Sequence, residues 1–391
     1  MTTTPQIIDL LIEARWIAAV DPDVVFKNHA VAIHGGRILA ILPAGEARIR
    51  YMPGNHVTLD DHILIPGLIN LHTHAAMTLM RGLADDRPLM DWLQNHIWPA
   101  ESAHMSAQFV LDGTRLACAE MLKGGITCFN DMYFFPEAAA TAASEYGMRA
   151  MLGITAIEFP TPYASDADDY LNKGLAVREQ WLNNPLIGFC IAPHAPYTVS
   201  DPTFERVLTL SAQLNLPVHC HIHETSHEIE ESLRQQKCRP LDRLNALGLL
   251  GPNFIGVHAV HINDHDLELI SETGSHIAHC PTSNLKLASG FAPVAQMRQL
   301  GINVGLGTDG AASNNRLDLF GEMRLASLLA KGLTGDASAL PANEILRMAT
   351  LNAANALGLG REIGSITPGK SADLCAVDLG ALEARPCFDP V

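Results

Sequence analysis

Short apolar runs alternate with longer amphipathic stretches over most of this chain. From residue 65 onward, eight runs have the length and composition of buried strands. They are residues 67–74, 124–132, 149–157, 187–196, 217–225, 254–262, 276–284 and 302–310. Segments with helical periodicity, such as residues 106–124, 203–214 and 318–332, lie between or after them. Eight strand–helix units over roughly 250–300 residues predict an α/β fold of the (β/α)8 TIM-barrel type.

The two ends of the chain have a different pattern. Residues 30–42, "AVAIHGGRILAIL", read as a strand, a Gly-Gly turn and a second strand, which predicts a hairpin. The tail, "GSITPGKSADLCAVDL", returns to strand and turn character but is too short for a domain. We therefore expect residues 1–64 and 366–391 to form one small, β-sandwich-like domain beside a catalytic barrel of residues 65–365. We expect its C-terminal part to be incomplete at Val391.

Composition and charge narrow the function classes. Hydrophobic residues make up 48% of the 391 residues and charged residues 17%, as in a compact enzyme with a large core. The formal charge of -16 argues against nucleic acid and anionic membranes as partners. No apolar run approaches the length of a membrane span, and the N-terminus is a poor signal peptide. The eight cysteines include no C-x-x-C pair, which indicates reduced thiols and a cytoplasmic protein.

Histidines and acids gather at the ends of the apolar runs. His72 and His74 close the first run, and alternation along a strand gives them one face. Taken alone, such a pair is better explained as ordinary polar residues at a strand end than as metal ligands. The other positions at run ends are His194, the group His219, His221 and His223, the following Glu224, the pair His258 and His261, and Asp309. Spacing cannot choose among the three histidines at 219–223, because all three share a face in a regular strand.

These residue types together supply the parts of a metal-dependent hydrolase. An open zinc site needs three or four nitrogen or oxygen ligands and a water. The metal lowers the pKa of that water to about 7, and a neighbouring carboxylate can move its proton. Each residue also has a plainer explanation: Asp309 could cap a helix, and Glu224 could be an acid favoured in a first helical turn. Their joint occurrence at successive strand ends favours the metal enzyme.

Several motifs resemble the amidohydrolase superfamily, in its cytosine-deaminase and chlorohydrolase-like branch. They are "PGLINLHTHAAM", "HIHET", "GVHAVHI", "HCPTSNLKLASG" and "GLGTDGAASNN", and the resemblance covers nearly the whole chain. The group most similar to this sequence is that of the 5′-methylthioadenosine/S-adenosylhomocysteine deaminases. The motifs are highly specific for the superfamily and the branch, and less specific for the substrate.

The resemblance implies a role for each position. The His-x-His motif makes His72 and His74 metal ligands, and the family's His-x-x-Glu pattern selects His221 as the third. Glu224 is then the proton shuttle, and His258 orients the attacking hydroxide. Asp309 matches an aspartate that binds the metal and accepts a proton. Since the fourth strand ends without the lysine of binuclear members, we expect one divalent ion, Zn²⁺ before Fe²⁺ or Mn²⁺. The resemblance also implies two substrate contacts, His194 and, for the ribose hydroxyls, Glu101.

The implied reaction is hydrolytic deamination of an adenine nucleoside. Some family members have arginines after the third strand for the carboxylate of S-adenosylhomocysteine, and residues 153–170 here contain none. We therefore expect 5′-methylthioadenosine or adenosine rather than S-adenosylhomocysteine. One alternative is deamination of another ring, such as guanine, 8-oxoguanine, a pterin or an s-triazine. Another is a scaffold without catalysis, which predicts missing ligands. A homo-oligomer is expected by analogy with the family.

Overall fold

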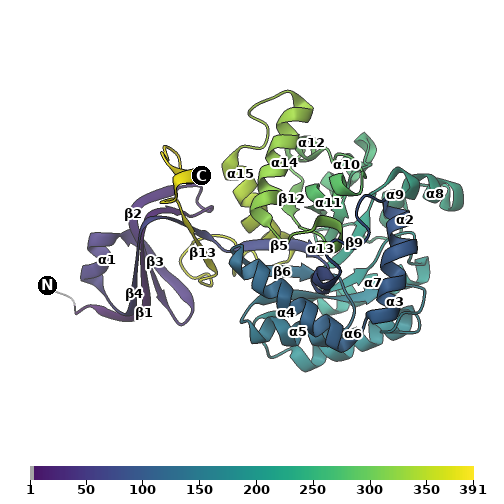
Figure 1. Ribbon diagram of the computed structural model, residues 1–391, viewed down its shortest axis with the longest axis horizontal. Helices are drawn as coiled ribbons and strands as arrows, with labels where there is room; N and C mark the ends of the chain where they lie inside the picture. The colour runs from purple at the N-terminus through teal and green to yellow at the C-terminus, as the bar shows by residue number, and fades with distance from the viewer. Residues whose placement is uncertain (1–3) are drawn as a thin grey trace.

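A barrel of eight parallel strands forms the larger part of the computed structural model, which describes residues 4–391 (Figure 1). Each strand pairs with the next one along the chain. This confirms the fold class predicted from the apolar runs, since every predicted run contains one barrel strand. The strands are β5 (Leu68–Thr73), β6 (Ile126–Asp131), β7 (Arg149–Ala156), β8 (Ile187–Pro193), β9 (Val218–Ile222), β10 (Phe254–His258), β11 (His276–His279) and β12 (Asn303–Leu306).

Helices surround the barrel, and side-chain caps mark where many of them begin. Ser106, Ser200 and Asp318 each accept a hydrogen bond from the backbone three residues on, which satisfies a donor that the first turn leaves free. The helices from α4 to α16 are α4 (Ala107–Lys123), α5 (Pro136–Glu145), α6 (Ala167–Trp181), α7 (Asp201–Leu214), α8 (Ser226–Gln236), α9 (Pro240–Ala246), α10 (Asp264–Thr273), α11 (Pro281–Lys286), α12 (Val294–Gln299), α13 (Ala311–Asn314), α14 (Leu319–Thr334), α15 (Ala342–Arg347), η3 (Met348–Asn352) and α16 (Ala353–Ala356).

Side chains join the first and last strands of the barrel. The Asn70 amide donates to Thr308 Oγ1 over 2.7 Å and accepts from the Thr308 backbone N–H over 2.9 Å. Asp309 N–H donates to the carbonyl oxygen of His72, 3.0 Å away. The buried Asn70 side chain therefore replaces a pair of hydrogen bonds that the backbone of a neighbouring strand would otherwise make. It fixes the end of β5, where His72 and His74 lie, against the segment that follows β12, where Asp309 lies.

Both chain ends contribute to a separate mixed sheet beside the barrel (Figure 1). Its order is β13–β4–β1–β2–β3, with β1 and β4 parallel and the other neighbours antiparallel. The predicted hairpin at Gly35-Gly36 is present, and both glycines have positive φ, as a two-residue turn requires. The exact domain limits at residues 64 and 366 stay a prediction. The elements are β1 (Gln6–Ala18), β2 (Val25–His34), β3 (Arg37–Pro43), α1 (Ala44–Arg50), β4 (Tyr51–Pro66), β13 (Leu374–Asp378) and the nearby η4 (Leu382–Ala384).

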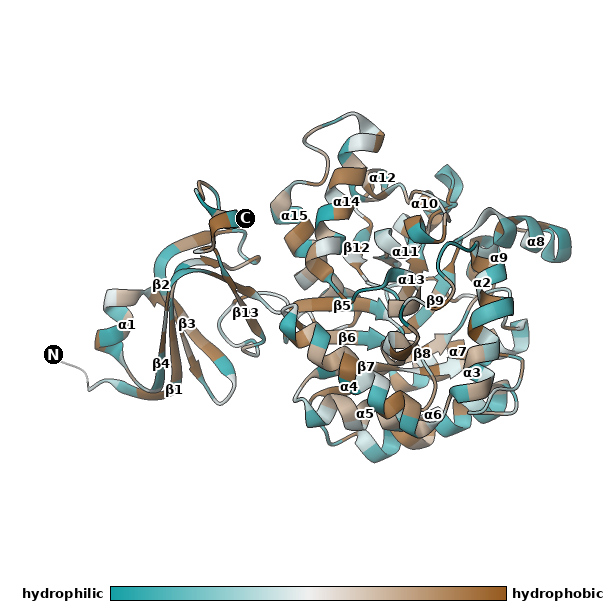
Figure 2. Cartoon of the chain, viewed as in Figure 1, coloured by the Kyte–Doolittle hydropathy of each residue, from teal (hydrophilic) through white to brown (hydrophobic). Residues whose placement is uncertain are grey.

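A helical excursion separates the first barrel strand from α4. It consists of η1 (Ala75–Met80), α2 (Leu89–Trp92), η2 (Leu93–Ile97) and α3 (Trp98–His104). Figure 2 shows hydrophobic residues along β5 and along β1 and β4, whereas α8 is largely hydrophilic. Within residues 4–391, no helix is both long and apolar enough to cross a membrane.

Candidate active site

Imidazole and carboxylate groups converge where the barrel strands end. His72 lies in β5 and His74 directly follows it, His221 lies in β9, His258 ends β10, and Asp309 follows β12. His72 and His74 Nε2 both lie 3.2 Å from Asp309 Oδ1, and His221 Nε2 lies 3.2 Å from His72 Nε2. Ligand atoms around a tetrahedral zinc with bonds of about 2.0–2.1 Å are separated by about 3.3 Å. The separations in the cluster thus fit one metal ion.

Hydrogen bonds fix which nitrogen of two rings faces the cluster. His74 Nδ1–H donates to the carbonyl oxygen of Met132 over 2.5 Å, and His221 Nδ1–H donates to that of His194 over 2.8 Å. A carbonyl oxygen can only accept, so these bonds place the ring proton on Nδ1. This leaves Nε2 of both rings to bind a cation. In metal sites the ligating histidine commonly donates its other ring N–H to a carbonyl oxygen in the same way.

The three histidines near the end of β9 separate into three environments. His221 Nε2 points to the cluster, while His219 Nε2 lies 3.0 Å from His72 Nδ1, behind that ring. His223 instead accepts a hydrogen bond from Leu241 N–H, outside the cluster. The strand ends at Ile222 and His223 has a φ of 51°, so the regular alternation stops there. The structure therefore brings His221 to the position that the resemblance implied.

Asp309 is held in a strained and crowded turn. Its φ is 59°, and its Oδ2 accepts from the hydroxyls of Ser283 (2.6 Å) and Ser313 (2.7 Å). Gly307 is needed nearby, because a Cβ there would lie 2.9 Å from His72 Cβ. Burial opposes ionisation, but hydrogen bonds from His72 and His74 hold the pKa of Asp309 well below its usual range. The carboxylate of Asp309 is thus an anion that faces the imidazoles of the cluster.

The same electrostatics shifts the pKa values of His72 and His74 in opposite directions. Burial lowers the pKa of His72 to about 4, although Asp309 acts in the opposite direction. For His74, burial also favours the neutral ring, but the hydrogen bond and charge of Asp309 outweigh it and raise the pKa to about 9. A divalent ion held between these groups would balance the charge of Asp309.

Glu224 and His258 lie side by side next to the cluster. Glu224 Oε2 is 3.6 Å from His258 Nε2, and burial raises the pKa of the Glu224 carboxyl group. His258 Nδ1–H donates to Asn284 Oδ1 over 2.9 Å, so the Nε2 lone pair faces the site. A raised pKa makes a carboxyl group a better proton acceptor than an ordinary glutamate, which suits a group that takes and returns a proton.

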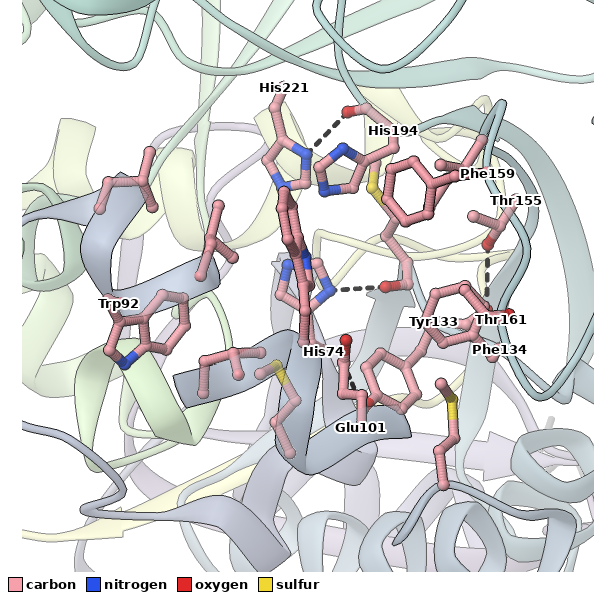
Figure 3. Close-up of a pocket in the computed structure, with 18 of the residues that line it drawn as sticks. His74, Trp92, Glu101, Tyr133, Phe134, Thr155, Phe159, Thr161, His194 and His221 are labelled. Carbon is pink, nitrogen blue, oxygen red and sulfur yellow. Dashed lines mark hydrogen bonds between the residues drawn. The ribbon is translucent and has the colours of Figure 1, made fainter. Parts of the chain in front are cut away.

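A cavity of about 310 Å³ opens from the cluster and is closed on one side by the excursion after β5. Its polar wall includes Glu101, which accepts a 2.7 Å hydrogen bond from the Tyr133 hydroxyl (Figure 3). Burial raises the pKa of Glu101, and the bond from Tyr133 counteracts part of this shift. His194 also lines the cavity, and its Nδ1 lies 3.0 Å from Thr198 Oγ1. The apolar wall includes Trp92, Leu93, Ile97, Trp98, Phe134, Ile157 and Phe159.

All eight residues to which the resemblance gave a role thus border one site. His72, His74, His221, His258 and Asp309 form the cluster, Glu224 adjoins it, and Glu101 and His194 lie along the cavity. Sequence reasoning missed the residues that hold them. Ser283 and Asn284 belong to the quoted "HCPTSN" motif, which gave a signal, whereas Tyr133 and Asn130 had none. Asn130 lies 3.2 Å from His219 Nδ1 and extends the contact behind His72.

A parallel barrel that gathers imidazoles, one aspartate and an adjacent acidic side chain at its strand ends defines a metal-dependent hydrolase. The family model described as "Amidohydrolase family" matches residues 63–390, and the chain belongs to this family.

Curated relatives match almost the whole chain. A protein of Saccharophagus degradans named 5-methylthioadenosine/S-adenosylhomocysteine deaminase is 48% identical over 97% of this chain and 86% of its own length. One of Teredinibacter turnerae with the same name is 46% identical over 100% of this chain and 88% of its own. The solved structure of an adenosine deaminase from Xanthomonas campestris with bound zinc superimposes with a TM-score of 0.97 at 50% identity, over 99% of this chain and 88% of that one.

Proposed function

We propose that this protein hydrolyses the 6-amino group of adenine nucleosides, giving the inosine derivative and ammonia. The observation that carries the proposal is that one cavity holds both the His/Asp cluster and the carboxylate of Glu101. A hydrolytic centre alone is compatible with deamination of many different rings. The buried carboxylate of Glu101 in the cavity wall adds a binding site for hydroxyl groups of the substrate. Carboxylate oxygens accept hydrogen bonds from such hydroxyls, and these charge-assisted bonds are strong. The names of the relatives agree with this substrate class.

His72, His74, His221 and Asp309 would hold one divalent metal ion, and Zn²⁺ suits this nitrogen and oxygen set, as Fe²⁺ and Mn²⁺ also do. Bound there, the ion supplies a Lewis acid that lowers the pKa of a water molecule to about 7. The remaining chemistry belongs to side chains of the chain.

Glu224 is placed to move the protons. It takes one proton from the attacking water and delivers it to N1 of the purine, which makes C6 more electrophilic. The lone pair of His258 Nε2 accepts a hydrogen bond from the same water and aims its oxygen at C6. The oxygen adds to C6, and the second proton of the water passes from it to the amino nitrogen through Asp309 or Glu224. The C6–N6 bond then breaks, and the amino group leaves as ammonia. One water is consumed, and the proton count balances.

Glu101 would bind the ribose diol and His194 would contact the substrate beside it. One Glu101 oxygen already accepts from Tyr133, which leaves the other oxygen for the sugar. With the ribose bound at Glu101, the 5′ substituent of the nucleoside would meet a cavity wall that carries no positive charge. Among the described residues that line the cavity there is no lysine or arginine. A buried carboxylate without a partner is unfavourable, so the cavity favours the methylthio or hydroxyl group over the amino-acid end of S-adenosylhomocysteine.

Ammonia release tests the proposal. Zinc-loaded protein and a Glu101→Ala variant would each be assayed with 5′-methylthioadenosine, adenosine, S-adenosylhomocysteine, guanine and 8-oxoguanine. We expect turnover of the first two, and a loss of that turnover in the variant. Turnover of free bases alone, unchanged in the variant, would support deamination of another ring and overturn both the substrate and the role of Glu101.

Two further expectations belong to this proposal. We propose a homo-oligomer, by analogy with the family, which light scattering of the purified protein would test. We also propose a cytoplasmic location, in keeping with the eight free cysteines. Fluorescence microscopy of a tagged chain would test that location.

A further inference from the structure

The carboxylate of Glu228 lies directly behind the peptide of Glu224. Glu228 is in the first turn of α8 and is 5% exposed. Its Oε1 accepts from the backbone N–H of His223 over 3.0 Å, and its Oε2 accepts from the backbone N–H of Glu224 over 2.9 Å. Both oxygens of a buried acid are thus used on two consecutive peptide groups, one of which belongs to the proposed proton shuttle.

This contact departs from ordinary helix capping. Thr225 caps α8, and its hydroxyl accepts from Glu228 N–H over 3.3 Å. In a capping box, the acid at that position returns a bond to the N–H of the cap residue itself. The same chain contains such a box at α10, where Asp266 accepts from the N–H of the cap residue Asn263. Glu228 instead reaches past the cap residue to the two positions before it.

The backbone at this point needs external support. His223 has a φ of 51°, a left-handed conformation that is unfavourable for a residue with a Cβ. The chain turns there from the end of β9 into α8, and the two peptide N–H groups are outside any strand or helix ladder. A buried donor without a partner is disfavoured by about 1–3 kcal/mol. Glu228 satisfies both donors with one side chain and thereby fixes the turn.

The backbone conformation at His223 and Glu224 also sets the direction of the Glu224 side chain. Its carboxylate lies 3.6 Å from His258 Nε2, which is beyond hydrogen-bond length, so this neighbour does not fix it. We propose that Glu228 is a positioning residue for the deamination, and that it acts by holding the peptide of Glu224 so that the shuttle carboxylate spans the water and the ring. This inference rests on the proposed function, in which Glu224 carries the proton. General acid–base transfer depends on hydrogen-bond geometry, so a shift of the peptide lowers kcat more than it changes binding.

Glu228→Gln is the test variant, and Thr225→Ala is its matched control. Gln keeps the size of the side chain but turns one acceptor into a donor that faces a peptide N–H. Thr225→Ala removes the hydroxyl that caps α8 and leaves intact the two hydrogen bonds from the peptide N–H groups of His223 and Glu224 to Glu228. With adenosine we expect Glu228→Gln to lower kcat at least about 10-fold with KM within about 2-fold. We expect Thr225→Ala to lower the Tm about as much as Glu228→Gln does, but to leave kcat within about 2-fold of wild type.

A double-mutant cycle separates positioning from a general structural role. If Glu228 acts through Glu224, then Glu228→Gln has no further effect on the residual rate of a Glu224→Gln variant. Multiplicative losses, or a kcat loss in Thr225→Ala as large as that in Glu228→Gln, would overturn the proposal. Unchanged kcat in Glu228→Gln would overturn it as well.

The cycle can fail independently of the substrate proposal. If the wild-type protein deaminates only a free base, the adenine nucleoside proposal is wrong, and the same cycle is measured with that base. Hydrogen exchange gives a readout that needs no turnover. The amides of residues 223 and 224 are expected to lose protection in Glu228→Gln and to keep it in Thr225→Ala. Equal protection in both variants contradicts the contact on which the inference depends.

Discussion

The mouth of the barrel and the terminal sheet treat buried charge in opposite ways. In the sheet, Glu13 is the buried charged residue within the described strands, and Arg48 and His56 both hydrogen-bond to it. At the barrel mouth, Glu224 and Asp309 are buried among imidazoles, and neither is paired with a lysine or arginine in the ion pairs of residues 4–391. The sheet neutralises its charge internally. The barrel mouth leaves charge available for a cation and a substrate.

This difference indicates that the buried acids of the barrel mouth serve the reaction, whereas the buried acid of the sheet serves stability. Burying an acidic group without a lysine or arginine beside it opposes folding unless hydrogen bonds compensate for the lost water. A native protein retains such groups where they perform a reaction. The comparison therefore predicts that changes at the barrel mouth and in the terminal sheet affect different measurements.

Removal of metal has the largest expected effect. A chelator is expected to abolish ammonia release, because no side chain of the site replaces the Lewis acid. It is also expected to lower the Tm, since an ion that binds only the folded state stabilises it by about 2.7 kcal/mol at about 100 times Kd. Differential scanning calorimetry and the activity assay, before and after addition of zinc, check both effects. Activity that persists after complete chelation would contradict the cluster as a metal centre.

Glu224→Gln comes next and is paired with Glu13→Gln. We expect Glu224→Gln to lower kcat by about 10²–10⁴-fold, the range of general acid–base catalysis, without loss of stability. Glu13→Gln is expected to do the reverse: kcat stays unchanged and the free energy of unfolding falls by about 1 kcal/mol, as for a partly exposed ion pair. Steady-state kinetics and urea unfolding measure the two variants together. If both variants lose stability equally, the contrast between the regions fails.

Tyr133→Phe gives a smaller and more specific effect. It removes only the hydroxyl that donates to Glu101 over 2.7 Å. We expect KM for adenosine to rise by about 3–10-fold, which corresponds to about 1 kcal/mol for the loss of one hydrogen bond, with kcat nearly unchanged. Initial rates over a range of adenosine concentrations check this. A large drop in kcat would instead place Tyr133 in the chemical step.

The smallest effect is a pH dependence of stability in the terminal sheet. The hydrogen bond from Arg48 lowers the pKa of Glu13 below its ordinary value of 4.5, with burial acting in the opposite direction. A lowered pKa in the folded state contributes stability above the unfolded pKa, and that contribution is lost as the pH falls through the folded value. The difference in unfolding free energy between wild type and Glu13→Gln should therefore shrink below about pH 4.5. A difference that stays constant down to about pH 3 would exclude this linkage.

The sequence predicts the strand ends well because buried parallel strands have a strong apolar pattern, and their polar termini stand out against it. It cannot choose His221 over His219 and His223, because that choice depends on where β9 ends and on the positive φ of His223. The contact between Tyr133 and Glu101 joins two elements without any local signature. The Thr225–Glu228 spacing does predict a helix cap, but not that the acid reaches past it.

The most direct test of the account is a comparison of adenosine with 2′,3′-dideoxyadenosine, in wild-type protein and in Glu101→Ala, both loaded with zinc. The central claim is that one cavity joins the hydrolytic cluster to a carboxylate that binds the sugar. It predicts that wild type has a much higher kcat/KM for adenosine, and that the variant loses most of this preference while its rate with the dideoxy substrate stays unchanged. Equal preference in both proteins would contradict the claim, because Glu101 would then not contact the diol.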